Sequence, residues 1–407
     1  MLMQFRRSRV PALVVLAMGL ASAAPASAQD PTEFPSWTIP GWTFTPGMVF
    51  GALFDSNVAI AGPDVNGNTA SDNLFQMEPF AQLEYRSPRT TFGSGYRPSV
   101  RRYRDLTELN GTDQHAYASV RNRVTRRVTL FANESYTDVA TTDQLVLNDL
   151  PFQRRGVRQN AIAAGTEARL TRSLDGVVRY DSSWVNFDEP EPLEPSTAPL
   201  HGGVVNGVRG ELTQRLTPRF SAGGTYNIRR ANLDGGTRHQ TFQDAGALVR
   251  YRLEERTTVE ATAGLAHLDD RERGLARSGF FVNGRVRYQV PRATLGAEYS
   301  RGFTPSFGFG GSSRTDDVSG YVQMPLAHNR LYAQESFSWR RARPLDPLEQ
   351  ERRSTWMHSV LGYTVQRWLR IEGYYAFSRQ DTRLAGGQVD RHIVGAQFVV
   401  SEPVRIR

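Results

Sequence analysis

Arginine recurs at every second position in several stretches of this chain, and its chemistry is the first clue to function. In RVRYQV (285–290), Arg285 and Arg287 alternate with Val286 and Tyr288. A guanidinium group stays positively charged and presents a planar fork of donors that matches carboxylate and phosphate groups. Arginines gathered on one surface attract anions, whereas arginines paired with Glu or Asp brace a protein. The pattern is compatible with both roles.

Residues for covalent or metal chemistry are not arranged for it. The seven histidines are scattered, and the sequence contains neither a ligand spacing typical of zinc nor a Gly-rich phosphate loop. His358 precedes Ser359, and neighbouring residues of a strand point to opposite faces, so these two cannot form a catalytic dyad. We therefore expect no enzyme activity, no cofactor and no metal ion.

The alternation of side chains indicates β-strands that are apolar on one face and charged on the other. Phe280, Val282 and Val286 share one parity, and Asn283 shares the other with the two arginines. After a short break at VPR (290–292) the same alternation resumes in ATLGAEYS (293–300). This stretch predicts two strands joined by a tight turn.

Breaks of this kind recur along the chain and form an internal repeat of 36 to 47 residues. They are marked by Arg89, Arg127, Arg172, Arg219, Arg256, Arg292, Arg330 and Arg367. Longer polar connections, such as GPDVNGNTASDN (62–73), lie between the repeats. Eight hairpins, a first strand near 46–58 and a last strand near 388–401 predict 18 strands in an up-and-down meander.

Three all-β architectures have repeats or strands of this kind. A β-propeller uses four short strands per repeat, and a soluble solenoid would not separate short turns from long loops. An even number of long strands with short turns at one end is typical of outer-membrane proteins. We predict an all-β fold: a transmembrane up-and-down antiparallel β-barrel of about 18 strands, with short periplasmic turns and longer extracellular loops.

Aromatic residues indicate the height of the membrane band. Trp184, Trp339 and Trp356 lie ten to twelve residues from a short turn, whereas Trp368 and Tyr288 lie beside one. At about 3.3 Å per residue and a tilt of about 40–45°, this separation is about 25 Å, the height of the lipid-facing band of a barrel. The spacing predicts two aromatic belts on the outer surface.

The charged parity is predicted to face the interior, because an Arg exposed to lipid at the bilayer midplane costs about 2–4 kcal/mol. A wall of 18 strands encloses an aqueous passage unless loops fill it. The predicted pore-lining residues are Arg97, Arg121, Arg123, Glu167, Arg169, Arg209, Glu211, Arg215, Arg250, Arg252, Arg285, Arg287, Glu298, Arg370 and Glu372.

The longest connection, residues 139–156, is the only one with an apolar cluster, which includes Leu145, Leu150 and Phe152. Such a cluster is unfavourable in water. One hypothesis folds it against the barrel mouth or inward, with Arg154 and Arg155 near a constriction. The other lays the connection over a neighbouring loop.

The amino terminus has the features of an export signal. Residues 1–28 contain a basic region, an apolar region and a small-residue cleavage site, so cleavage is predicted after Ala28. Residues 29–45 are predicted to form a periplasmic segment and residues 46–407 the barrel. Removing the signal lowers the formal charge from +8 to +5, that is, 46 basic against 41 acidic residues. The chain has no Cys, so disulfides cannot stabilise it.

Three segments resemble the type-two families of β-barrel porins of Gram-negative bacteria. They are PGMVFGALFDSNV (46–58), with an early D-x-N-V, MEPFAQLEYRSPRTTFGSGYRPSVRRY (77–103) and VSEPVRIR (400–407). The resemblance implies an outer-membrane barrel associated with exopolysaccharide or capsule production, and it supplies no catalytic residue. The Arg-lined interior also resembles the alginate-export barrel. The terminal aromatic residue usual in barrels is absent, and Phe398 lies several residues inside the end.

These features predict an outer-membrane, porin-like channel for the passive passage of anionic solutes, with export of acidic exopolysaccharide as one version. The alternative is a non-conducting structural barrel that docks periplasmic export machinery. Outer-membrane lipid and lipopolysaccharide are the expected partners, together with the anionic solute or polysaccharide and periplasmic export proteins, and nucleic acid is not one. Ionic current through a planar bilayer separates the two functions.

Overall fold

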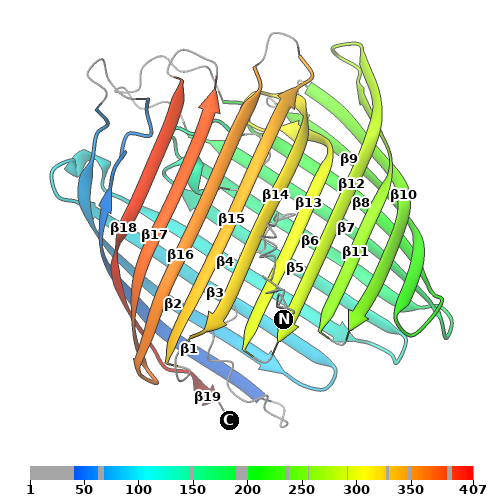
Figure 1. Ribbon diagram of the computed structural model, residues 1–407, viewed down its shortest axis with the longest axis horizontal. Coiled ribbons are helices and arrows are strands. Elements are labelled where there is room, and N and C mark those ends of the chain that lie inside the picture. Colours follow the sequence, from blue (N-terminus) through cyan, green and yellow to red (C-terminus); the bar gives the residue numbers. More distant parts are fainter. Residues whose placement is uncertain are drawn as a thin grey trace, which may run out of the picture.

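The computed structural model describes residues 41–62, 68–145, 150–188, 200–233, 238–254, 256–290, 292–326, 330–346, 350–382 and 387–406. These residues form one antiparallel sheet that closes on itself into a barrel (Figure 1). Each strand from β1 to β17 pairs with the next along the chain, and β18 pairs with β1. The predicted up-and-down transmembrane barrel of 18 long strands is confirmed.

The strands are β1 (Gly41–Asp55), β2 (Asp72–Arg86), β3 (Thr90–Tyr103), β4 (Gly111–Arg123), β5 (Val128–Val139), β6 (Val157–Arg169), β7 (Leu174–Phe187), β8 (Gly203–Arg215), β9 (Phe220–Leu233), β10 (Arg238–Glu254), β11 (Thr257–Asp270), β12 (Leu275–Val290), β13 (Ala293–Ser306), β14 (Gly311–Pro325), β15 (Leu331–Pro344), β16 (Arg352–Gln366), β17 (Leu369–Thr382), β18 (Gln388–Ser401) and β19 (Val404–Ile406). Two short 3-10 helices, η1 (Thr107–Leu109) and η2 (Thr142–Gln144), lie in connections at the end of the barrel opposite the short turns. No helix in the described ranges is long and apolar enough to cross a bilayer.

The barrel closes between its first and last long strands. Gly47–Asp55 of β1 pair with β18, from Gly47 opposite Ser401 to Asp55 opposite Ile393. After an interruption at Pro403, which has no backbone N–H, the chain resumes as β19 and pairs with Trp42–Phe44 of β1. Closure satisfies the backbone groups of both sheet edges, which lipid cannot do.

Hydroxyl side chains shape several of the short turns. In the turn after β8, Thr217 Oγ1 accepts hydrogen bonds from the backbone N–H of Arg219 (3.2 Å) and Phe220 (2.9 Å). Thr125 and Thr171 do the same in the turns after β4 and β6. Ser and Thr favour such local bonds over ladder bonds. This chemistry explains why the sequence breaks occur where they do.

The two parities of the strands have opposite environments. Phe280 and Leu265 are 76% and 64% exposed and lie on the outward parity, where lipid covers them. On the other parity, Phe242, Leu248 and Leu268 are fully buried inside the barrel. The apolar outer surface and the pairing of the last long strand with the first are the architecture of an outer-membrane β-barrel.

Three details differ from the sequence-based expectation. The first strand begins at Gly41 and not near residue 46, and β19 was not anticipated because three residues after a proline carry no alternation. Trp356 does not belong to an outer belt: its Nε1 donates to the carbonyl oxygen of Asp143, inside the barrel, at 2.9 Å. The predicted signal peptide (1–28) and residues 29–40 of the predicted periplasmic segment lie outside the described residues.

Candidate functional site

Ion pairs between non-adjacent strands lie on the inner surface of the barrel. Arg121 of β4 donates two hydrogen bonds to Glu167 of β6, at 2.9 and 2.5 Å, across the intervening β5. Arg250 of β10 donates to Glu211 of β8 at 2.7 Å, across β9. The concave inner surface brings such long side chains together. In paired strands, residues directly opposite each other point to the same face. The pairing therefore identifies the inward-facing residues of each strand around the barrel.

The inward parity contains every residue that the alternation assigns to the pore. Arg97 on β3 lies opposite His115 on β4, and Glu298 on β13 lies opposite Arg285 on β12. The pairing of β6, β8 and β10 with their neighbours places their predicted pore-lining residues on the same inward face. The pairing of β17 with β18 does the same for Arg370. His358 is inward and Ser359 outward, so the two do not face each other.

Some of these arginines brace the wall. Arg285 donates to Glu298 Oε2 from Nε (3.0 Å) and Nη2 (2.8 Å), and Arg250 also donates to Glu260 at 2.5 Å. These pairs join two or three strands at a time. Their charges are compensated locally, so they contribute rigidity and little net field.

A second group of arginines lies at the short-turn end of the lumen, on the side formed by β4 to β12, and we call it the arginine arc. It consists of Arg123, Arg169, Arg215, Arg252 and Arg287, each at or near the last residue of β4, β6, β8, β10 or β12. Arg169 and Arg215 approach Asp175 only at 3.8 and 3.4 Å. In the part of the chain that the structure describes, Arg123, Arg252 and Arg287 have no ion-pair partner. The arc is therefore a net positive surface.

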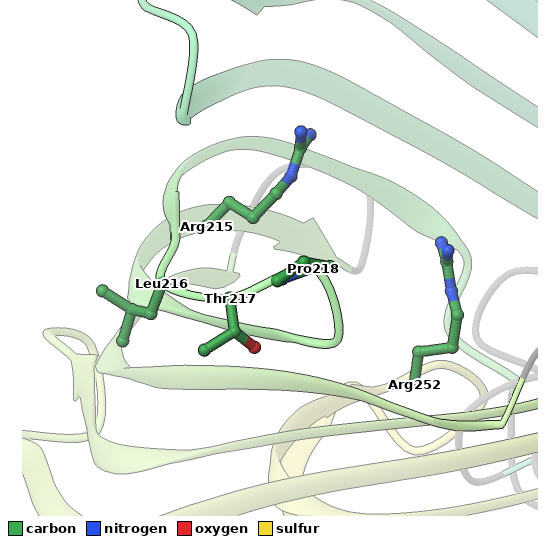
Figure 2. Close-up of a pocket in the computed structure, with 5 residues that line it drawn as sticks. All are labelled: Arg215, Leu216, Thr217, Pro218 and Arg252. Carbon is green, nitrogen blue, oxygen red and sulfur yellow. The ribbon is translucent and has the colours of Figure 1, made fainter.

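A cavity of about 570 Å³ adjoins the arc. It is lined by Arg215, Leu216, Thr217, Pro218 and Arg252. Figure 2 shows the side chains of Arg215 and Arg252 extending in the same direction from either side of the turn after β8. Two guanidinium groups beside one water-accessible space can attract an anion, because Arg252 has no ion-pair partner among the described residues and Arg215 shares the single carboxylate of Asp175 with Arg169.

The described residues of the connection between β5 and β6, 140–145 and 150–156, include several that contact the far wall of the barrel. Gln380 of β17 accepts a hydrogen bond from the backbone N–H of Phe152 and donates to the carbonyl oxygen of Leu150, both at 2.8 Å. The rings of Phe152 and Trp356 on β16 lie 5.3 Å apart. The connection therefore leaves the wall at β5 and reaches the wall formed by β16 and β17.

A buried ionic cluster fixes the start of this connection, just after β5. Arg391 of β18 donates to Asp143 Oδ2 at 3.0 Å and to Asp55 Oδ2 of β1 at 2.6 Å. Ser378 of β17 donates to Asp143 Oδ2 at 3.0 Å. The side chains of Arg391 and Asp55 are 2% and 0% exposed. This cluster joins the inward connection to the seam where the barrel closes.

Arg154 and Arg155 were predicted to lie near a constriction. In the structure, each guanidinium group binds a backbone carbonyl oxygen of a neighbouring connection. Arg154 donates to the carbonyl oxygen of Leu109 at 2.8 Å, and Arg155 donates to that of Asp188 at 2.6 Å. Both guanidinium groups thus hold neighbouring connections in place.

The tip between β13 and β14 also enters the lumen. Gly308 exchanges backbone hydrogen bonds with His201 at 2.9 and 3.0 Å, and Arg229 of β9 donates to the carbonyl oxygen of Phe303 at 3.0 Å. Gly308 has φ +88°, and a Cβ there would lie 2.9 Å from Pro151, so the close approach of the two connections requires glycine.

Apolar side chains fill the space where these connections meet. The cluster includes Leu145 and Leu150 from the inward connection, and Leu233, Phe242 and Phe303 from the wall. Inspection of the sequence alone misses it, although Phe242 and Leu268 lie on the parity otherwise occupied by charged residues. That interruption of the alternation is the signal that could have revealed a packed lumen.

Comparisons with known proteins give structural neighbours only. No protein-family model matches the chain, and no curated protein matches it. OpdQ of Pseudomonas aeruginosa is 9% identical with a TM-score of 0.44, over 90% of this chain and 98% of that chain. OccAB4 of Acinetobacter baumannii is 9% identical with a TM-score of 0.43, over 91% and 100%. A BenF-like porin from Pseudomonas fluorescens Pf-5 is 9% identical with a TM-score of 0.44, over 90% and 99%. Values this low assign neither a family nor a substrate.

Proposed function

We propose that this protein is an outer-membrane channel that passes small anionic solutes by diffusion. The observation that supports the proposal is the arginine arc, which places five guanidinium groups along the short-turn end of the lumen against the single carboxylate of Asp175, and three of the five have no ion-pair partner among the described residues. A shared positive potential raises the local concentration of anions and lowers that of cations. The braced pairs, such as Arg121 with Glu167, keep the wall rigid around the path.

The packed lumen favours small solutes over a polymer. The β5–β6 connection crosses from one wall to another and is held by the buried Arg391 cluster. An acidic polysaccharide chain would need this connection to move, whereas a small solute needs only a gap beside it. Export of an acidic exopolysaccharide therefore has less support than uptake or release of small anions.

The triple variant Arg123→Gln, Arg252→Gln and Arg287→Gln is expected to lower the chloride-to-potassium permeability ratio by about threefold or more at low salt, because three uncompensated charges leave one mouth of the lumen. The measurement is the reversal potential across a planar bilayer under a KCl gradient.

Arg102→Gln is the matched control. Arg102 lies opposite Phe75, an outward residue that is 51% exposed, so its charge is outside the lumen. The control should leave the permeability ratio unchanged. Equal ratios in the wild type and the triple variant would refute a role for the arc in selectivity, and a folded wild-type sample without current would favour the docking alternative.

A further inference from the structure

The hydrogen-bonded wall is incomplete between β12 and β13. The pairing of β12 with β11 runs from Leu275 to Tyr288. Its pairing with β13 covers only Val282 to Val290, with Val282 opposite Arg301. Among the residues described, no strand pairs with Leu275–Phe281 on the β13 side. Membrane barrels normally leave no such edge, because lipid cannot satisfy its backbone groups.

The upper part of β13 bends inward instead of following β12 (Figure 1). Phe303 shares the parity of Leu295, which faces outward lower in the strand, yet Phe303 is only 6% exposed and belongs to the lumen cluster. A Cβ on Gly279 of β12 would lie 3.2 Å from Cζ of Phe303. The ring of Phe303 therefore covers the inner face of β12 where glycine provides no side chain.

Both sides of the unpaired edge are apolar. Phe281 points inward and packs against the lumen cluster. Phe280, the next residue, points outward and is 76% exposed. An apolar surface thus continues from the lumen, past the ring of Phe303, to the outer face of the barrel.

The sequence also disfavours a permanent ladder at this position. Continuing the register from Val282 and Arg301 would place Phe280 opposite Phe303 and Ser278 opposite Pro305. Pro305 has no N–H to donate, so a ladder there would lack a bond. A strand edge that is paired loosely can open at a low free-energy cost.

We propose that this seam, Leu275–Phe281 of β12 beside Gly302–Pro305 of β13, is a lateral portal between the lumen and the outer leaflet. It would pass the apolar part of an amphipathic solute, with Phe303 as the plug. The portal rests on strand pairing and packing alone. It does not depend on the anion preference proposed for the arc.

The absence of Cys from the chain allows a direct test with single variants in phospholipid bilayers. The probe is a lipid that carries a maleimide on a short tether. The tether places the maleimide at the depth of the acyl chains. Phe303→Cys is expected to react more than about tenfold faster than Leu233→Cys, because only the seam exposes lumen residues to lipid. Leu233 is the matched control: it is fully buried in the same cluster, but β9 pairs at this residue with both neighbours.

Phe281→Cys keeps the plug in place and shows whether the native seam opens. It should react more slowly than Phe303→Cys and faster than Leu233→Cys. Phe280→Cys, on the outer face, gives the upper limit of reactivity, and heat-modifiable electrophoretic mobility reports that each variant is folded. If Phe281→Cys and Leu233→Cys react at the same rate, the lateral portal is wrong, and the channel function is untouched because no current is measured.

Discussion

Arg391→Met is expected to lower the free energy of unfolding by about 3–5 kcal/mol, because two buried carboxylates lose the cation that they share. Asp55 and Asp143 approach Arg391 at 2.6 and 3.0 Å in a site almost closed to water. The cluster joins β18, β1 and the inward connection, so its loss weakens barrel closure and the lumen packing together. Urea unfolding in detergent, followed by tryptophan fluorescence, measures the change.

A charge-free version of the same site separates lost pairing from lost packing. Adding Asp55→Asn and Asp143→Asn to Arg391→Met removes all three buried charges and keeps the side-chain volumes similar. This triple variant should recover more than about half of the lost stability, since a neutral site carries no unpaired ion. A single variant within about 1 kcal/mol of the wild type, the ordinary value for a surface substitution, would show that the cluster is not a stabilising anchor.

Replacing residues 143–152 with Gly-Gly-Ser is expected to raise the single-channel conductance about threefold or more, because an 18-stranded wall encloses an aqueous passage wherever connections do not fill it, and this replacement removes one of the two connections that enter the lumen. The linker is geometrically feasible: the backbone N–H of Thr142 donates to the carbonyl oxygen of Gln153 at 3.1 Å, so the two ends are adjacent. Planar-bilayer recording at fixed salt measures the effect.

The arginine arc is retained in this replacement, which provides an internal control. The reversal potential under a KCl gradient should therefore keep its sign while the conductance rises. Arg391 keeps Asp55 as a partner, so the barrel should still close. Unchanged conductance would mean that the connection does not obstruct the path, whatever its position in the lumen.

The strands and their orientation could be predicted from the sequence because lipid imposes a strict rule. Charged residues are expelled from the outer surface at a cost of about 2–4 kcal/mol each at the midplane, so the alternation itself records the register. Ser or Thr at the start of a short turn, as at Thr217, marks where several of the hairpins reverse. Both signals are local.

The contents of the lumen could not be predicted in the same way. Arg391 and Asp143 are 248 residues apart in the chain, and nothing local indicates that they meet. Trp356 was assigned to the outer belt by its distance from a turn, but its parity places it inside, where it contacts Phe152. Tertiary packing of connections depends on contacts across the barrel, which alternation does not encode.

The seam between β12 and β13 shows a further limit. Alternation continues through Phe303, so a strand that follows its neighbour and one that bends inward have the same pattern. The structure shows that the pairing of β12 with β13 stops at Val282. Local departures of this kind are expected at functional positions, where a sequence violates the rules that shape the rest of the fold.

Thiol accessibility along β12 tests the central claim most directly, that arginine positions face an enclosed aqueous lumen while their neighbours face lipid. Single variants Arg285→Cys, Val286→Cys, Arg287→Cys and Tyr288→Cys are embedded in bilayers and exposed to a charged, membrane-impermeant thiol reagent. The reagent should modify the variants at 285 and 287 and spare those at 286 and 288. Modification at 286 and 288 with protection at 285 and 287, or uniform modification of all four, would contradict the assignment of the lumen.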